Sequence, residues 1–586
     1  MTDERFTRLQ IWLGLCVLCG IAFSPVLGAD FLDWDDNFNV YNNPRLRALT
    51  GENLRWMFFD FGPDIRYKPL THLTWALVHA VGGLKPFGYH LTNFLLHCVN
   101  TGLLLLVLQR LLELGAGPAT VEDDRRWQHL AAGGGALFWA LQPLRVETVA
   151  WVSVTSYSLM VFFLLLSLLA FLRCDFGRSL FRQGRYWLAL GLFQLGMMSF
   201  PFAVGFSIAI LAVSIYPLQR FGAGNRWRAV LELLPFLALT VLMCVVAIYG
   251  QHVKKGMWGD PESLERLSLA TRLVAAAYYL AYYAWRPFYP FHHYTVNEDL
   301  VPLDPQSPRL MFAYLLLIGL TIGTLMLRRR RPGALAAWIG FAGLAGPALK
   351  LTGEPPFPGP GDRYSILCGL VTAAVLCFWM NAAGTPEGRR RWLTVLGVAG
   401  LIFALHSRMQ SEVWHDNETF FTDQLANQQA GPTRAKAHCV LGHLAAQSND
   451  VATALDHYDK AWQESAVVAA EHVIDEHAEL LLGTGRTEAA IAMLENARTM
   501  LPDRYRTGLY LGAALITAHR REEGIAVCED TLRRHPDQPD AFGFYAAILI
   551  GHRETALATQ VLQRGLQQHP DHRGLRAMLD SIGSTR

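Results

Sequence analysis

The sequence predicts an all-α protein in two parts: a polytopic transmembrane helical body of about 11 spans, followed by an α-solenoid outside the membrane. Two observations support this prediction. Long apolar runs recur through residues 1–407, and the 586-residue chain is 52% hydrophobic but only 17% charged, which is too apolar for an ordinary soluble protein. Residues 432–586 instead carry a helical repeat with a period of 34 residues.

The body is predicted from apolar runs long enough, or nearly long enough, to cross a bilayer. The expected spans are residues 9–29, 88–110, 129–143, 148–172, 186–199, 201–218, 229–249, 310–327, 333–349, 365–381 and 392–406. The first run lacks a clear cleavage site of small residues, so we expect a retained span and not a signal peptide. Segments 268–286 and 70–84 are expected to be re-entrant or interfacial helices.

Arginine clusters orient these spans. They lie at 173–185, 220–228, 328–331 and 389–391. With a cytoplasmic N-terminus, every cluster falls on the cytoplasmic side, as the positive-inside rule requires. Loops 30–87, 250–309 and 350–364 and the C-terminal repeats then lie outside. The arginine-, alanine- and glycine-rich composition indicates a bacterial inner membrane with the repeats in the periplasm.

The repeat is visible in single residues. Pro502, Pro536 and Pro570 are 34 residues apart, which is the period of the tetratricopeptide repeat. Such two-helix units bury their apolar faces only by stacking on neighbours, so a curved surface for a protein partner is expected. Segment 408–431 is predicted to be a linker helix and 432–586 to hold about four repeats.

Adjacent carboxylates, Asp35 and Asp36, follow the first span directly. Desolvation and mutual repulsion would raise the pKa of one of them toward neutrality, as a general base requires. The alternative is an Asx-type turn that ends a helix. No set of His, Cys and Asp residues has the spacing of a metal site, so no metal or other cofactor is expected.

A polar face is predicted on the second span. His90, Asn93, His97 and Asn100 share one side of this helix, and polar groups in a span either form a functional site or hydrogen-bond to other helices. Arg363, before a later span, could hold a lipid-linked phosphate, or it could form a surface pair with Asp362. Lys254 and Lys255 are weaker candidates for the same phosphate.

Several short motifs occur together in a specific order. They are Trp34-Asp35-Asp36, Lys68-Pro69-Leu70-Thr71, Gly88-Tyr89-His90-Leu91-Thr92-Asn93, the stretch 143–152, Asp362-Arg363-Tyr364 and Trp414-His415-Asp416 with Glu418. In this order they resemble the transmembrane O-mannosyltransferases that carry tetratricopeptide repeats, and their bacterial relatives of the GT-C glycosyltransferase class. The resemblance covers most of the chain.

The resemblance implies transfer of a sugar from a polyprenyl-phosphate carrier to a protein or glycan hydroxyl outside the membrane, with inversion at the anomeric carbon. By carry-over, Asp35 or Asp36 is the base. The same resemblance makes Lys68, His90 and Arg363 candidates to hold the donor phosphate, Glu147 a second acid at the same face of the membrane, and Asn93 a further substrate-binding residue. Arginine and lysine can stabilise a phosphate leaving group without a metal.

The chain departs from this pattern near the expected site. Gln142 stands where the family usually has His, Val154-Thr155-Ser156-Tyr157 where it has a charged run, and Ser199-Phe200-Pro201 where it often has Ser-Lys-Pro. An alternative is therefore a catalytically inactive GT-C-like scaffold whose repeats organise a membrane or envelope assembly. A transporter is less favoured, because the spans show no internal duplication.

The composition argues against a nucleic-acid-binding protein and against a disulfide-rich protein. The net charge of +2 gives no bulk electrostatic basis for nucleic-acid binding. Seven of the nine cysteines lie in or beside apolar runs and the other two lie in different repeats, which indicates small packing residues and not a disulfide framework.

Overall fold

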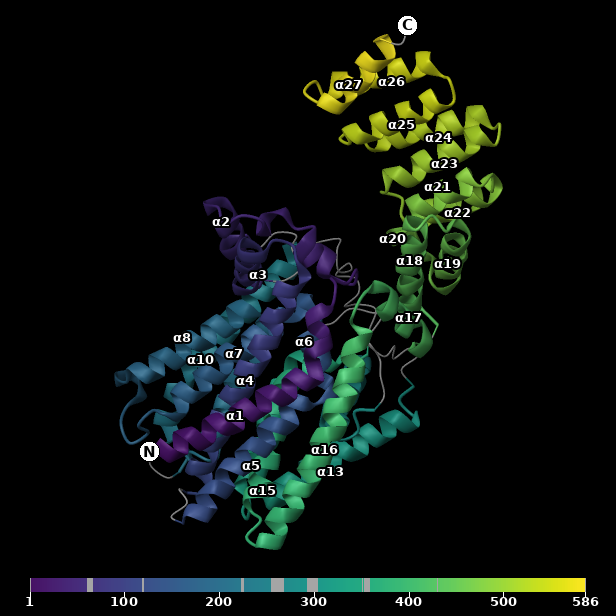
Figure 1. Ribbon diagram of the computed structural model, residues 1–586. Helices are drawn as coiled ribbons and strands as arrows, with labels where there is room; N and C mark the ends of the chain where they lie inside the picture. Colours follow the sequence, from purple (N-terminus) through teal and green to yellow (C-terminus); the bar gives the residue numbers. More distant parts are fainter. Residues whose placement is uncertain are drawn as a thin grey trace. The chain divides into compact units, whose positions relative to one another are not determined.

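The computed structural model describes residues 2–60, 67–117, 121–222, 226–253, 268–291, 304–349, 351, 359–428 and 430–584. Lys254 and Lys255 lie outside the described residues. The described part of the chain is helical and contains no strand. It divides into two compact units, Met1–Phe420 and Phe421–Arg586, which we call the membrane body and the repeat region (Figure 1).

Long helices and several shorter ones make up the membrane body (Figure 1). They are α1 (Thr2–Phe23), α2 (Gly51–Phe59), α3 (Pro69–Gly82), α4 (Pro86–Gly115), α5 (Glu122–Leu141), α6 (Val146–Ala150), α7 (Thr155–Leu172), α8 (Gly184–Ser199), α9 (Phe206–Ile215), α10 (Arg226–Val253), α12 (Leu269–Trp285), α13 (Pro308–Leu327), α14 (Pro332–Ala345), α15 (Ser365–Asn381) and α16 (Pro386–Val413). Five of them, α3, α4, α13, α14 and α16, begin with proline, whose missing N–H is not needed in the first turn.

Eight helical segments among the described residues are long and apolar enough to cross a membrane. These eight segments are 6–28, 86–115, 152–172, 226–249, 308–327, 332–349, 362–381 and 386–413. They match eight of the eleven expected spans, and the protein is a multi-pass membrane protein. The other three expectations fall on shorter or more charged helices: α5 starts with five charged residues, α8 has 16 residues, and the run after Phe200 ends at Ile215.

Close packing joins α5 to α15. Their contact surface includes Gly134 and Gly135, and a Cβ atom on Gly135 would lie 2.6 Å from the carbonyl oxygen of Ala373. Small residues of this kind let helices in membranes approach closely, because van der Waals contact replaces the hydrophobic effect there. The glycine run in α5 is thus explained by helix packing.

The loops that the sequence predicts on one side of the membrane do meet at one end of the body, which we call the loop end. The Asp30 N–H donates to His415 O at 2.8 Å, Gln142 Nε2 to Pro287 O at 2.6 Å, and Tyr282 Oη to Asp362 Oδ1 at 2.7 Å. At the opposite end, Tyr216 Oη donates to Gly115 O at 3.1 Å and Arg110 Nε to Leu172 O at 3.1 Å. The 17-residue α12 is not among the candidate spans, and its interfacial placement stays a prediction.

Helix pairs form the repeat region, after α17 (Asn417–Asn427). The helices are α18 (Pro432–Gln447), α19 (Val451–Glu464), α20 (Ala466–His472), α21 (Ile474–Gly483), α22 (Thr487–Met500), α23 (Tyr505–Thr517), α24 (Arg521–Arg534), α25 (Pro539–Gly551), α26 (Thr555–Gln568) and α27 (Arg573–Ser584). The short α20 lies between the first and second pairs, which explains why the first repeat is less regular. The segment expected as one linker helix contains the end of α16 and α17, and the predicted domain boundaries stay a proposal.

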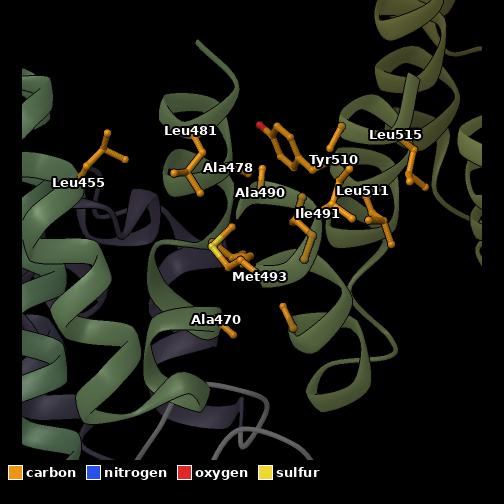
Figure 2. Packing of buried hydrophobic residues seen from close by; sticks show 14 residues of the cluster. Leu455, Ala470, Ala478, Leu481, Ala490, Ile491, Met493, Tyr510, Leu511 and Leu515 are labelled. Atoms are coloured by element: carbon orange, nitrogen blue, oxygen red, sulfur yellow. The ribbon is translucent and has the colours of Figure 1, made fainter. Parts of the chain in front are cut away.

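A hydrogen bond between neighbouring repeats joins residues that are 34 positions apart in the sequence. Arg504 Nη1 donates to the carbonyl of Ala470, 34 residues earlier, at 2.6 Å. Apolar layers fill the space between the pairs, and Leu481, Ile491 and Leu511 lie in one such layer (Figure 2). Each pair therefore buries its apolar face on the next, as the period predicts.

Candidate functional site

The acidic loop after α1 is held in place from both sides. The Asp33 N–H donates to Asn417 Oδ1 at 2.7 Å, and Asn417 Nδ2 donates back to Asp33 Oδ2 at 3.0 Å. The Tyr41 hydroxyl also donates to Asp33. Asp33 therefore anchors the loop to the segment that follows α16, within the membrane body.

Asp36 is buried, with 1% of its surface exposed. Its Oδ2 accepts from the Leu32 N–H at 3.0 Å, and its Oδ1 accepts from the Ser153 N–H at 2.8 Å and from the Ser153 hydroxyl. Burial raises the pKa of Asp36 to about 7, and the bonds from Ser153 and Leu32 oppose the rise. Of the two adjacent acids, Asp36 is therefore the one whose pKa is raised toward neutrality.

The neighbouring Asp35 is only half-buried. Its backbone carbonyl accepts from the N–H of Asn39 at 3.0 Å and from Asn39 Nδ2 at 3.1 Å. The two adjacent carboxylates are therefore not equivalent: Asp36 is fixed in the interior, and Asp35 is the more accessible of the two.

Lys68 is connected to the same group of residues. Its Nζ donates to Asn39 Oδ1 at 2.7 Å and lies 4.6 Å from the centre of the Trp75 ring. Asn39 Nδ2 donates in turn to Ser153 Oγ at 3.2 Å. We call Asp36, Asn39, Lys68 and Ser153 the Asp36 network. This network places a cation and an acid close together at the loop end. A reaction in which a phosphate is the leaving group needs this combination.

A second polar group, the Glu147–Arg363 pair, joins α6 to the turn before α15. The Arg363 N–H donates to Glu147 Oε2 at 2.6 Å, and the Arg363 guanidinium donates to Oε1. Burial raises the pKa of Glu147, and the positive charge of Arg363 counteracts this. The alternative of a surface pair between Asp362 and Arg363 is wrong, because the carboxylate that binds Arg363 is the buried Glu147 and Asp362 accepts from Tyr282.

The polar face of α4 contacts backbone carbonyls of other segments. His90 Nε2 bonds to Asp30 O at 3.3 Å, and Asn93 Nδ2 donates to Trp151 O at 3.0 Å. His97 Nε2 lies 2.9 Å from Ala140 O, and Asn100 Nδ2 lies 2.8 Å from Ser158 O. These contacts match the alternative in which polar groups join helices, and a substrate role for His90 and Asn93 stays a prediction.

Two aromatic residues, Tyr157 and Phe200, lie at positions where the resemblance leads us to expect charges, and they pack with further aromatic rings. The Tyr157 and Phe200 ring centres are 4.5 Å apart, and those of Phe202 and Tyr364 are 5.4 Å apart. Tyr364 contacts Arg363, whose guanidinium carbon lies 4.5 Å from its ring centre. An apolar cluster, here called the aromatic cluster, therefore lies beside the Glu147–Arg363 pair.

Three residues of this region were missed by sequence reasoning. Asn39 and Ser153 complete the Asp36 network, and Arg145 is buried with its Nη2 donating to Ser365 Oγ and its guanidinium 5.7 Å from the Trp139 ring centre. Ser153 directly follows the motif that ends at Val152, which is a usable signal. Asn39 carries no comparable signal. Among the described residues, no group of three or more His, Cys, Asp or Glu side chains is arranged to hold a metal.

The fold and this loop end define a class: a multi-pass membrane protein with a C-terminal tetratricopeptide region. The tetratricopeptide repeat family model matches residues 481–548. The chain is also similar to named proteins. Protein O-mannosyl-transferase Tmtc2 of Drosophila melanogaster is 33% identical over 222 residues, which is 36% of this chain and 22% of that protein. Protein O-mannosyl-transferase TMTC4 of Homo sapiens is 30% identical over 188 residues, 30% of this chain and 24% of that protein.

The chain is thus a relative of these O-mannosyl-transferases, and the match spans about a quarter or less of their length. Among solved structures, ArnT from Cupriavidus metallidurans bound to undecaprenyl phosphate aligns with 91% of this chain and 80% of its own, at 13% identity and a TM-score of 0.33.

Proposed function

We propose that the chain is a membrane glycosyltransferase that moves a sugar from a polyprenyl-phosphate carrier to a protein or glycan hydroxyl on the extracytoplasmic side. The observation that carries the proposal is the Asp36 network, which holds the pair Asp35–Asp36 and the cation of Lys68 together at the loop end. The similarity to O-mannosyl-transferases supports the reaction class. The arginine clusters support a cytoplasmic N-terminus, which would place the loop end and the repeats in the periplasm of a bacterial inner membrane.

Geometry divides the roles of the two acids. A general base must come within hydrogen-bond reach of the acceptor hydroxyl, and this requirement precedes any consideration of pKa. Asp36 is buried and its two oxygens already accept three hydrogen bonds. We therefore assign the base to Asp35 and a positioning role to Asp36, which fixes the loop against Ser153.

The proposed step is a single displacement. The acceptor O–H transfers its proton to the Asp35 carboxylate while its oxygen forms a bond to the anomeric carbon of the donor. The bond from that carbon to the phosphate oxygen breaks, and its electron pair leaves with the polyprenyl phosphate, with inversion of configuration. Lys68 would stabilise the charge that develops on the phosphate. Because Arg363 is already paired with Glu147, its share in phosphate binding would require a change at that pair.

The test is sugar transfer by purified full-length protein from radiolabelled polyprenyl-phosphate sugars. We expect Asp35→Asn to lower the transfer rate by about 10²- to 10⁴-fold, the usual contribution of a general base. Asp36→Asn should also lower transfer, and it should change the stability of the loop as well. Asp304→Asn, at an exposed loop position, is the matched control and should leave transfer unchanged. Full transfer by Asp35→Asn would refute the assigned base.

The second candidate is a catalytically inactive scaffold whose repeat region organises a membrane or envelope assembly. The aromatic cluster favours it, because Tyr157 and Phe200 are buried where the family pattern has charged residues. In this case wild-type protein would show no transfer, while Asp35→Asn would retain the same co-purifying protein partner as wild type. In either case the repeat region is proposed to bind a protein, as acceptor or as partner.

A further inference from the structure

The end of the body opposite the loop end carries an excess of positive charge. Residues 173–232 contain seven arginines and two acidic residues. The arginines are Arg173, Arg178, Arg182, Arg185, Arg220, Arg226 and Arg228, and the acids are Asp175 and Glu232. All of them lie in the α7–α8 connection, in the α9–α10 connection or in the first two turns of α8 and α10.

One buried carboxylate joins the two connections. Glu232 accepts from the Leu180 N–H at 2.7 Å, from Arg228 Nε at 3.2 Å and from Arg220. The Tyr186 hydroxyl donates to the Glu232 carbonyl at 2.8 Å. The basic residues are therefore presented by a fixed structure and not by independent loops.

Two guanidinium nitrogens of this arginine cluster have no hydrogen-bond partner among the described residues. They are Arg220 Nη1 and Arg228 Nη2, and both are buried. Arg220 as a whole is only 7% exposed. A buried, charged donor without an acceptor is costly, so such a group normally has a partner, which can be a protein atom, a water molecule or a bound ion. Glu232 can neutralise only one of the two arginines that it contacts, which leaves a net positive charge.

Exposed apolar side chains adjoin these arginines. Trp227, between Arg226 and Arg228, is 81% exposed, and Trp187 is 51% exposed with its Nε1 donating to Phe181 O at 3.0 Å. Further along α10, Leu231 and Leu234 are also exposed. Tryptophan at the level of the head groups, with leucine beyond it, is the arrangement that accommodates a lipid.

We propose that Arg220, Arg226 and Arg228 form a binding site for the phosphate of an anionic glycerophospholipid, whose acyl chains lie along the exposed apolar side of α10. Basic pockets between membrane helices on the cytoplasmic side bind such head groups. The guanidinium groups supply charge-assisted donors to the phosphate oxygens, and Trp227 lies at the glycerol level. This site is separate from the Asp36 network and does not depend on the proposed transferase activity.

The test uses full-length protein in a neutral detergent, with native mass spectrometry of bound lipid and a titration of lipid against the thermal unfolding midpoint. Phosphatidylglycerol should bind and raise the midpoint, whereas phosphatidylcholine should do neither. Arg226→Gln/Arg228→Gln should weaken phosphatidylglycerol binding by about fivefold per arginine. The control Arg329→Gln/Arg330→Gln removes the same charge from an exposed cluster and should bind as wild type does.

Arg228 contacts Glu232, so the double variant could lose folded structure. Arg226→Gln alone keeps that contact, because Arg226 bonds only to the Phe221 carbonyl in the described structure, and it should still weaken binding about fivefold. Equal binding by Arg226→Gln and the control would overturn the proposal. Displacement of phosphatidylglycerol by equimolar inorganic phosphate would also overturn it, because the ligand would then be a free anion.

Discussion

At the loop end of the membrane body, buried charged and hydrogen-bonded contacts lie beside apolar ones, whereas between the helix pairs of the repeat region the buried layers are apolar. The body places Glu147 against Arg363 and Asp36 against Ser153. The repeat region places Leu481, Ile491 and Leu511 in one layer (Figure 2). The loss of one partner in the first case leaves an unsatisfied polar group, and the loss of a side chain in the second leaves a cavity. The difference shows that the repeats are stabilised by stacking, and it is consistent with the site that we propose at the loop end.

The largest effect is expected when the Glu147–Arg363 pair is broken. Arg363→Met leaves the Glu147 carboxylate buried without its cation, which should lower the free energy of unfolding by about 3–5 kcal/mol. The measurement is unfolding of the purified protein in mixed detergent micelles of increasing denaturing power. The double variant Glu147→Gln/Arg363→Met removes both charges and should recover part of the loss. A double variant as unstable as Arg363→Met would show that packing, and not the charge pair, stabilises this region.

A cavity in the repeat region should lower the free energy of unfolding somewhat less than Arg363→Met does. Leu511→Ala removes a buried side chain from the layer of Figure 2, and we expect a loss of about 3 kcal/mol. Hydrogen exchange of the amides in α21 to α24 reports this loss locally. The control is Val467→Ala, because Val467 is half exposed and its truncation leaves no cavity. Uniform loss of protection throughout the chain would contradict the separation into two units.

The third prediction concerns the pH dependence of Asp36. Its pKa is about 7 in the folded protein, above its ordinary value of 3.8, so between these values the folded state binds the proton more strongly than the unfolded chain. This contribution to stability is full below pH ~4 and is lost as pH rises to about 7, with a slope of at most about 1.4 kcal/mol per pH unit.

Asp36→Asn removes the titration, and the difference in unfolding free energy between wild type and variant should therefore flatten above pH ~7. Asp304→Asn, at an exposed position, is the control and should keep the wild-type slope. A difference that is constant from pH 4 to pH 7 would show that Asp36 does not carry the shifted proton.

The repeats were predictable because their signal is redundant. The same type of residue recurs at equivalent positions every 34 residues. Pro502, Pro536 and Pro570 therefore establish the register of the repeat even where other residues vary. The extra helix α20 breaks this step and was not foreseen. Eight spans were predictable from length and apolar content. The other three stay predictions, because α5 begins with charged residues and because α8 and the segment Pro201–Ile215 are shorter than the candidate spans.

The site was less predictable because its contacts join distant parts of the chain. Asp35 and Asp36 are adjacent, and their motif does not tell them apart. They differ in the structure because Ser153, 117 residues away, binds one of them. Likewise, the polar face of α4 was foreseen, but the carbonyls that it contacts depend on how α4 packs. Motif order located the region, and tertiary packing decided each residue's partner.

The smallest effect is expected at a surface ion pair between repeats. Arg498 Nη2 lies 2.8 Å from Asp530 Oδ2, and both side chains are 29% exposed. Solvent screens such pairs, and ordering two long side chains opposes the attraction, so Arg498→Ala should lower the free energy of unfolding by less than about 1 kcal/mol. Arg533 and Arg534 also lie near Asp530, so the carboxylate keeps partners after the change. Hydrogen exchange in α22 and α24, compared at low and high salt, measures the effect. A loss as large as that of Leu511→Ala would mean that charge, and not apolar stacking, holds neighbouring repeats together.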